Sequence, residues 1–184
     1  MSVPWNLKAR RRPSEQRRWL TGIAAGCLVL GASAWAADAA PVAKAPNAAE
    51  NQSRTSLHQE LVFKASPQRI YEILLSSQQF TAFSGKPATI DSQVGGAFSL
   101  FGGHIVGRNV ELIPNQLIVQ AWRPADWPAG AYSLVRMQLK PQGADTLLIL
   151  DHTGFPAGGF DHLSAGWTEH YWQPLTKYLA SGAK

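Results

Sequence analysis

The stretch FDHLSAGWTEHYWQPLTKYL, residues 160–179, decides the fold because its apolar side chains recur at the spacing of an α-helix. Five of them share one stripe: Leu163, Trp167, Tyr171, Leu175 and Tyr178. Thr168, Glu169 and Lys177 fall largely off that stripe, so we expect a long helix that covers an apolar surface. Pro174 lies inside the pattern and lacks a backbone N–H, which predicts a kink one turn earlier.

The chain between residues 57 and 156 supplies that surface as short strands separated by turn residues. We expect strands over residues 57–64, 88–92, 97–101, 104–112, 117–123, 132–140 and 146–153. One helix is expected after Ser66, a suitable N-cap, with Pro67 at its first position. It ends by Gln79, and a loop through Phe80 and Phe83 follows. This order predicts an α+β fold with a curved antiparallel sheet of six to seven strands around the long C-terminal helix.

The N-terminal residues have the three parts of an export signal over residues 1–36. Basic residues up to Arg18 precede an apolar run over residues 19–35, and Ala34-Trp35-Ala36 forms an A-x-A cleavage site. Arg17 and Arg18 resemble a twin-arginine signal, and both the Tat and the Sec routes remain open. We therefore expect a periplasmic or otherwise extracytoplasmic protein. The alternative is an uncleaved segment that anchors the chain in a membrane.

Residues 37–56 are rich in Ala, Pro, Asn and Ser without periodicity, which predicts a flexible linker before a domain over residues 57–181. The formal net charge of +5 comes from the first 36 residues, because Lys and Arg balance Asp and Glu in the rest of the chain. Nucleic-acid binding by the domain is therefore not expected. Membrane contact is expected only through an uncleaved leader.

Several short motifs in the domain resemble those of the activator of Hsp90 ATPase homologue family, which belongs to the START-like (SRPBCC) superfamily. They are Gly95-Gly96-x-Phe98, Gly103-x-x-x-Gly107, Leu112-x-Pro114, Trp122-Arg123, Trp127-Pro128-x-Gly130, Gly154-x-Pro156, Gly166-Trp167 and Tyr171-Trp172. The resemblance implies a START-like, Bet v-like helix-grip fold, in which a small helix pair and a curved sheet grip the C-terminal helix. It also implies a hydrophobic cavity, and it supplies no catalytic residues and no cofactor.

The charges on each strand predict which side chains face the cavity, because an unpaired charge costs several kcal/mol to bury. Asp151, Arg136 and Arg123 should face outward, so the alternate residues of their three strands should face inward. The resulting ligand-binding set is Phe98, Gln120, Trp122, Ser133, Val135, Met137, Leu148, Leu150, His152, Trp167 and Tyr171. Burial among leucines should lower the pKa of His152.

Gln120, Ser133 and His152 allow two interpretations. They converge as orienting groups in an apolar ligand pocket, or they satisfy each other inside a closed core. Metal binding is not expected, because the Asp-His and Glu-His pairs are adjacent in sequence and their side chains diverge.

The sequence therefore predicts a cofactor-free binding module for a small hydrophobic or lipid-like molecule. The first alternative is a cochaperone-like module that binds another folded protein, as the resemblance implies. The second is an enzyme of the cyclase or hydrolase type.

Overall fold

A computed structural model describes residues 48–182. The predicted export signal and most of the predicted linker lie outside the described residues. Within the described part, no helix has the length and apolar character needed to cross a bilayer.

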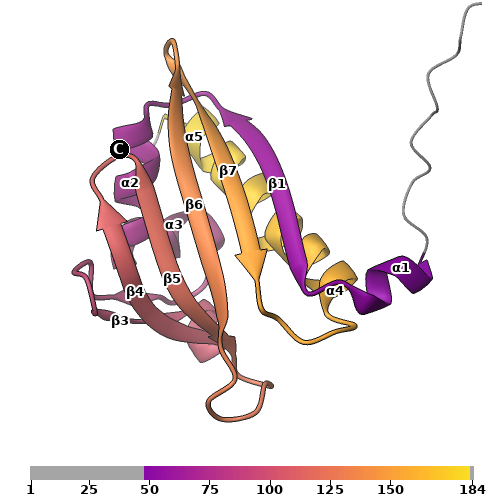
Figure 1. The fold of residues 1–184 in the computed structure, drawn as a ribbon. Coiled ribbons are helices and arrows are strands. Elements are labelled where there is room, and N and C mark those ends of the chain that lie inside the picture. The colour runs from indigo at the N-terminus through magenta and orange to yellow at the C-terminus, as the bar shows by residue number, and fades with distance from the viewer. Residues whose placement is uncertain (1–47, 183–184) are drawn as a thin grey trace, which may run out of the picture. The chain divides into compact units, whose positions relative to one another are not determined.

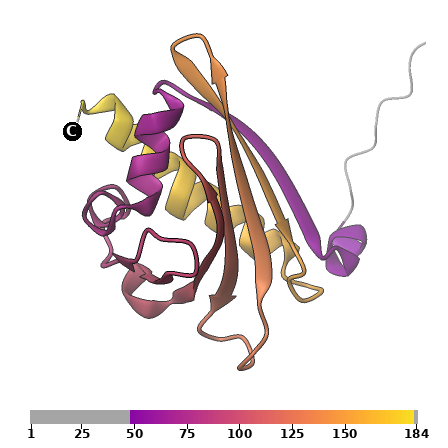
Figure 2. The ribbon, with the colours of Figure 1, turned by 60° about the vertical axis from the view of Figure 1, so that its left-hand side comes forward.

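Seven antiparallel strands form one curved sheet in the order β1-β7-β6-β5-β4-β3-β2 (Figures 1 and 2). They are β1 (Ser56–Phe63), β2 (Thr89–Ile90), β3 (Ala97–Leu100), β4 (Ile105–Ile113), β5 (Leu117–Pro124), β6 (Ser133–Gln142) and β7 (Asp145–Thr153). The first strand pairs with the last, so the sheet is a meander from β2 to β7 with β1 added at its edge. The predicted fold class is confirmed, and the largest error in strand length is at β2, which has two residues.

Two short helices, α2 (Pro67–Leu75) and α3 (Ser77–Ser84), follow β1 and cover the same face of the sheet as the C-terminal helix (Figure 1). Ser66 caps α2 as predicted, because its hydroxyl accepts a hydrogen bond from the Arg69 N–H. The predicted loop through Phe80 and Phe83 is wrong: Ser76 caps a second helix that buries both rings. The family resemblance, which implied a helix pair, gave the better prediction here.

The C-terminal helix is continuous from Phe160–Gly166 (α4) through Trp167–Trp172 (η2) to Gln173–Ala180 (α5). Its middle segment η2 is a π-helix, in which the Gln173 N–H bonds the Thr168 carbonyl five residues earlier. This wider turn lies directly before Pro174, at the place where the sequence predicted a kink. The predicted stripe is buried except for Tyr178, which is half-buried.

Helix α1 (Ala48–Ser53) lies within the stretch predicted as a flexible linker, and η1 (Phe101–Gly103) is a short turn after β3. The described end of the predicted linker is thus largely helical, and two residues separate α1 from β1.

Candidate functional site

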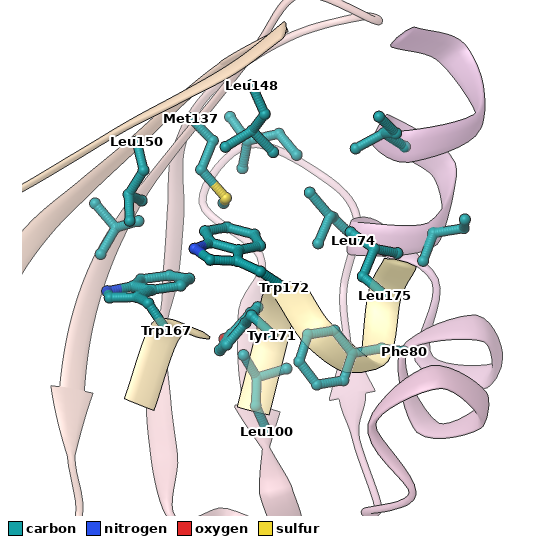
Figure 3. Packing of buried hydrophobic residues seen from close by; sticks show 14 of the residues in the cluster. Leu74, Phe80, Leu100, Met137, Leu148, Leu150, Trp167, Tyr171, Trp172 and Leu175 are labelled. Atoms are coloured by element: carbon teal, nitrogen blue, oxygen red, sulfur yellow. The ribbon is translucent and has the colours of Figure 1, made fainter. Parts of the chain in front are cut away.

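Three indole rings form a continuous stack between the sheet and the C-terminal helix. The Trp167 ring stacks on Trp122 from β5 at 5.1 Å between centroids, and on Trp172 at 5.1 Å on its other side. In an α-helix, residues five apart point in different directions. The π-turn brings Trp167 and Trp172 onto one face, where both indoles lie beneath Met137 and Leu150 (Figure 3).

A chain of hydrogen bonds connects this stack to the sheet. The Trp167 Nε1–H donates to His152 Nδ1 at 3.1 Å, so the proton of the neutral imidazole is on Nε2. Nε2 then donates to Ser133 Oγ at 2.7 Å, and Ser133 donates to the Trp122 carbonyl oxygen at 3.2 Å. With this tautomer, each N–H and O–H group in the chain donates to one acceptor, so all of them are hydrogen-bonded.

His152 is fully buried, and desolvation of its charged form lowers its pKa from 6.5 to about 4. The hydrogen bonds act in the same direction, because a protonated Nδ1 would face the indole N–H of Trp167. The imidazole is therefore neutral at physiological pH, and its pKa is lowered in the direction expected from the sequence.

The contact between Ser133 and His152 does not form a catalytic nucleophile. In a serine hydrolase the hydroxyl donates to the imidazole, and a carboxylate accepts the second imidazole proton. Here the imidazole donates to Ser133, and its other nitrogen accepts from Trp167. Ser133 and His152 are also buried, so this pair serves the structure of the core.

All eleven residues of the predicted ligand-binding set are buried, with exposures of 5% or less. His152 and Ser133 meet as expected, but Gln120 donates instead to Asn109 Oδ1 at 3.0 Å, away from them. Ser133 and His152 thus satisfy each other inside the core, as in the second of the two interpretations, whereas Gln120 is satisfied by Asn109. Three residues of the predicted set, Trp122, Trp167 and Tyr171, line one cavity together.

That cavity lies at one end of the grip and has a volume of about 590 Å³. Its aromatic walls come from Phe101, Trp122, Trp127, Trp167 and Tyr171. The walls are completed by the first turns of the C-terminal helix and by the loop before it. This volume is within the usual range of small-molecule sites, about 300–1,000 Å³. The mostly apolar lining is also typical of such sites. We call this cavity the end pocket.

Charged and titratable groups ring the end pocket: Lys86, His104, Asp126, His162, Glu169 and His170. Among the described residues, no group of three or more His, Cys, Asp or Glu side chains is arranged to hold a metal ion. Trp122 carries the one buried side-chain polar atom without a hydrogen-bond partner in this part of the chain, its Nε1.

Sequence reasoning missed most of the end pocket. Phe101, Trp127 and His170 come from a turn, a loop and the exposed side of the helix, and strand periodicity does not show that these segments meet. The signal available was Trp127 in its Pro/Gly loop, a large aromatic residue in a segment that is not part of a strand.

The fold and the aromatic end pocket define a helix-grip protein of the START-like type. The chain belongs to the family described as activator of Hsp90 ATPase homolog 1-like protein, whose pattern matches residues 64–180. It is 27% identical over 122 residues to the human activator of 90 kDa heat shock protein ATPase homolog 1, covering 66% of this chain and 36% of that protein. A Dictyostelium discoideum homologue is 34% identical over 106 residues, covering 57% of this chain and 28% of the relative.

Among solved structures, an HSP90 activator from Plasmodium falciparum superimposes with a TM-score of 0.66 at 26% identity. The superposition covers 69% of this chain and 97% of the Plasmodium falciparum chain. A Colwellia psychrerythraea Aha1 dimer, with a TM-score of 0.60 at 18% identity, shares the fold over 71% of this chain. The chain spans about a third of the length of the curated relatives it matches.

Proposed function

We propose that this domain is a binding module whose end pocket holds a small, apolar, ring-containing molecule. The observation that carries this proposal is a cavity of about 590 Å³ with aromatic walls on the inner side of the C-terminal helix. Flat rings suit such walls, because stacked or edge-on aromatic contacts add about 0.5–1.5 kcal/mol beyond the apolar area they bury. The charged rim leaves room for a polar substituent at the mouth.

Gly166 gives the pocket a position that can be filled without distorting the backbone. It lines the pocket in ordinary helical geometry, with φ −57° and ψ −43°. A Cβ added there meets no heavy atom within 4 Å apart from neighbours in its own helix. Ala165, the preceding residue, is exposed and does not line the pocket. Gly166→Phe should therefore occupy the cavity, and Ala165→Phe is its matched control.

The test is a fluorescence titration with N-phenyl-1-naphthylamine, a neutral dye made of a naphthyl and a phenyl group, which brightens in apolar surroundings. The unaltered protein and Ala165→Phe should bind it saturably, and Gly166→Phe should lose at least tenfold in affinity. Equal binding by all three proteins would place the dye elsewhere, and absence of binding by the unaltered protein would count against the proposal.

A second candidate is a module that binds another folded protein. It is favoured by the names of the relatives, which describe activators of a heat shock protein or of its ATPase. Large apolar side chains available for such a contact include Tyr132 at 50% exposure and Leu134 at 43%. Measuring ATP hydrolysis by a 90 kDa heat shock protein with and without this chain separates the candidates. Acceleration by the unaltered protein and by Gly166→Phe alike would favour this second candidate.

Export remains a proposal of its own, supported by the basic, apolar and Ala34-Trp35-Ala36 parts of the sequence. N-terminal sequencing of protein from the extracytoplasmic fraction should begin at Ala37. Full-length protein confined to the cytosol would contradict export and would strengthen the protein-binding candidate.

A further inference from the structure

One wall of the end pocket is a short segment between β7 and the middle of the C-terminal helix. It contributes six lining residues: Pro156, Ala157, Gly159, His162, Leu163 and Gly166. Phe155 and Leu163 fix this wall in the core, at 1% and 7% exposure. Between them the chain is largely exposed and closes a turn in which the Gly159 N–H bonds the Pro156 carbonyl at 3.1 Å. A turn with so little burial depends on contacts with neighbouring segments for support.

Residues 48–55, comprising α1 and the two residues after it, supply that support through the backbone. The Gly158 N–H donates to the Gln52 carbonyl at 2.9 Å, and the Gly154 N–H donates to the Thr55 carbonyl at 2.9 Å. These bonds hold the turn at its start and close to its end. Figure 1 shows α1 beside α4, at the foot of β1.

Two side chains of the same segment contact the first turn of α4. Asn51 Nδ2 donates to Asp161 Oδ1 at 2.8 Å, and the Arg54 guanidinium lies 3.9 Å from the centre of the Phe160 ring. Arg54 also donates to Asn51 Oδ1 at 3.4 Å, which holds the amide in the orientation that Asp161 requires. Residues 48–55 thus contact this part of the chain at four residues, Gly154, Gly158, Phe160 and Asp161, through both backbone and side-chain groups.

We propose that residues 48–55 are a latch that positions this wall and thereby sets how fast a ligand leaves the end pocket. This inference rests on the proposed function for its second half. The latch lies ahead of the family match, which begins at residue 64. Asn51 and Arg54 are positioning residues, because they do not line the pocket and act through the wall.

Asn51 and Asp161 allow a reciprocal test. Asn51→Asp places two carboxylates in contact and should open the latch, whereas Asp161→Asn keeps an amide donor facing an amide acceptor. The double variant Asn51→Asp/Asp161→Asn restores a carboxylate opposite an amide, with the two roles exchanged. If Asn51→Asp acted by some means other than its contact with Asp161, the second substitution would not restore the unaltered behaviour.

The measurements are NMR amide exchange at Gly154 and Gly158 and stopped-flow dissociation of N-phenyl-1-naphthylamine, all on the full chain. In Asn51→Asp, both exchange and dye dissociation should accelerate about two- to fivefold, as expected for breaking an exposed polar pair. Asp161→Asn and the double variant should stay near the unaltered rates. Unchanged exchange in Asn51→Asp would overturn the latch, and faster exchange with unchanged dye dissociation would overturn its role in ligand release. Failure of the unaltered protein to bind the dye would overturn the proposed function and that role, while the exchange rates would still decide whether the latch exists.

Discussion

Replacing His152 with leucine should destabilise the protein by about 1–3 kcal/mol, although leucine has a similar volume and a better transfer free energy. The loss arises because the Trp167 Nε1–H is left buried without an acceptor. Ser133 loses one partner but keeps the Trp122 carbonyl as its acceptor, so it adds little to the cost. Side-chain volume alone would predict little change in stability, so the hydrogen bonds of the imidazole decide the outcome.

The pH dependence of stability gives a second, independent measure of the same imidazole. Below pH 6.5 the unfolded chain binds a proton at His152, whereas the folded protein stays neutral until about pH 4. The unfolded state therefore binds more protons in this window, and stability falls as the pH drops through it. Each tenfold change in proton affinity is worth about 1.36 kcal/mol. As the pH falls from above 6.5 to about 4, His152 should therefore lower the free energy of unfolding by about 3 kcal/mol.

The assay is urea unfolding of the unaltered protein, His152→Leu, Trp167→Phe and the double variant at pH 7.5, 6 and 5. The two substitutions should be less than additive, because each removes the same hydrogen bond. His152→Leu should also lose the dependence on pH between 6.5 and 5 that belongs to the imidazole. A His152→Leu protein as stable as the unaltered one, with the same pH profile, would refute the role assigned to the hydrogen-bond chain.

Three further changes test the packing around the site. Gly107→Ala should cost about 3 kcal/mol or more in urea unfolding, because its Cβ would clash with the backbone oxygen of Ala121 in β5; a cost below about 1 kcal/mol would contradict this close approach. Trp167→Phe should cost about 1–2 kcal/mol more than Trp122→Phe, because only the first indole N–H has a hydrogen-bond partner; equal losses would show that the bond contributes nothing. Ser76→Ala should lower stability by about 1 kcal/mol through loss of the α3 cap, and an unchanged urea midpoint would argue against that cap.

Sequence reasoning worked where one physical rule acts alone. The cost of burying Asp151 or Arg136 fixed the strand faces, and Leu148, Leu150 and His152 are buried as that rule required. The register of a strand with one charged face leaves no second solution, because a shift by one residue would bury the charge. The 3.6-residue stripe likewise located the C-terminal helix, which the structure confirms.

The errors arose where tertiary contacts override local patterns. Phe80 and Phe83 lie in a short helix whose core-facing side is hardly visible from sequence, and the cap at Ser76 is its main local signal. Trp172 falls off an ideal α-helical stripe and is buried only because the π-turn rotates it inward. The end pocket depends on which loops converge at one end of the sheet, and periodicity within a strand carries no information about that.

We propose above that the end pocket holds a small apolar molecule. Native mass spectrometry of freshly purified protein, run beside Gly166→Phe, tests it most directly. We expect a reproducible added mass on the unaltered protein that is displaced by N-phenyl-1-naphthylamine and missing from Gly166→Phe. Unaltered protein that carries no added mass and takes up no dye, or an added mass retained by Gly166→Phe, would show that the end pocket is not the binding site.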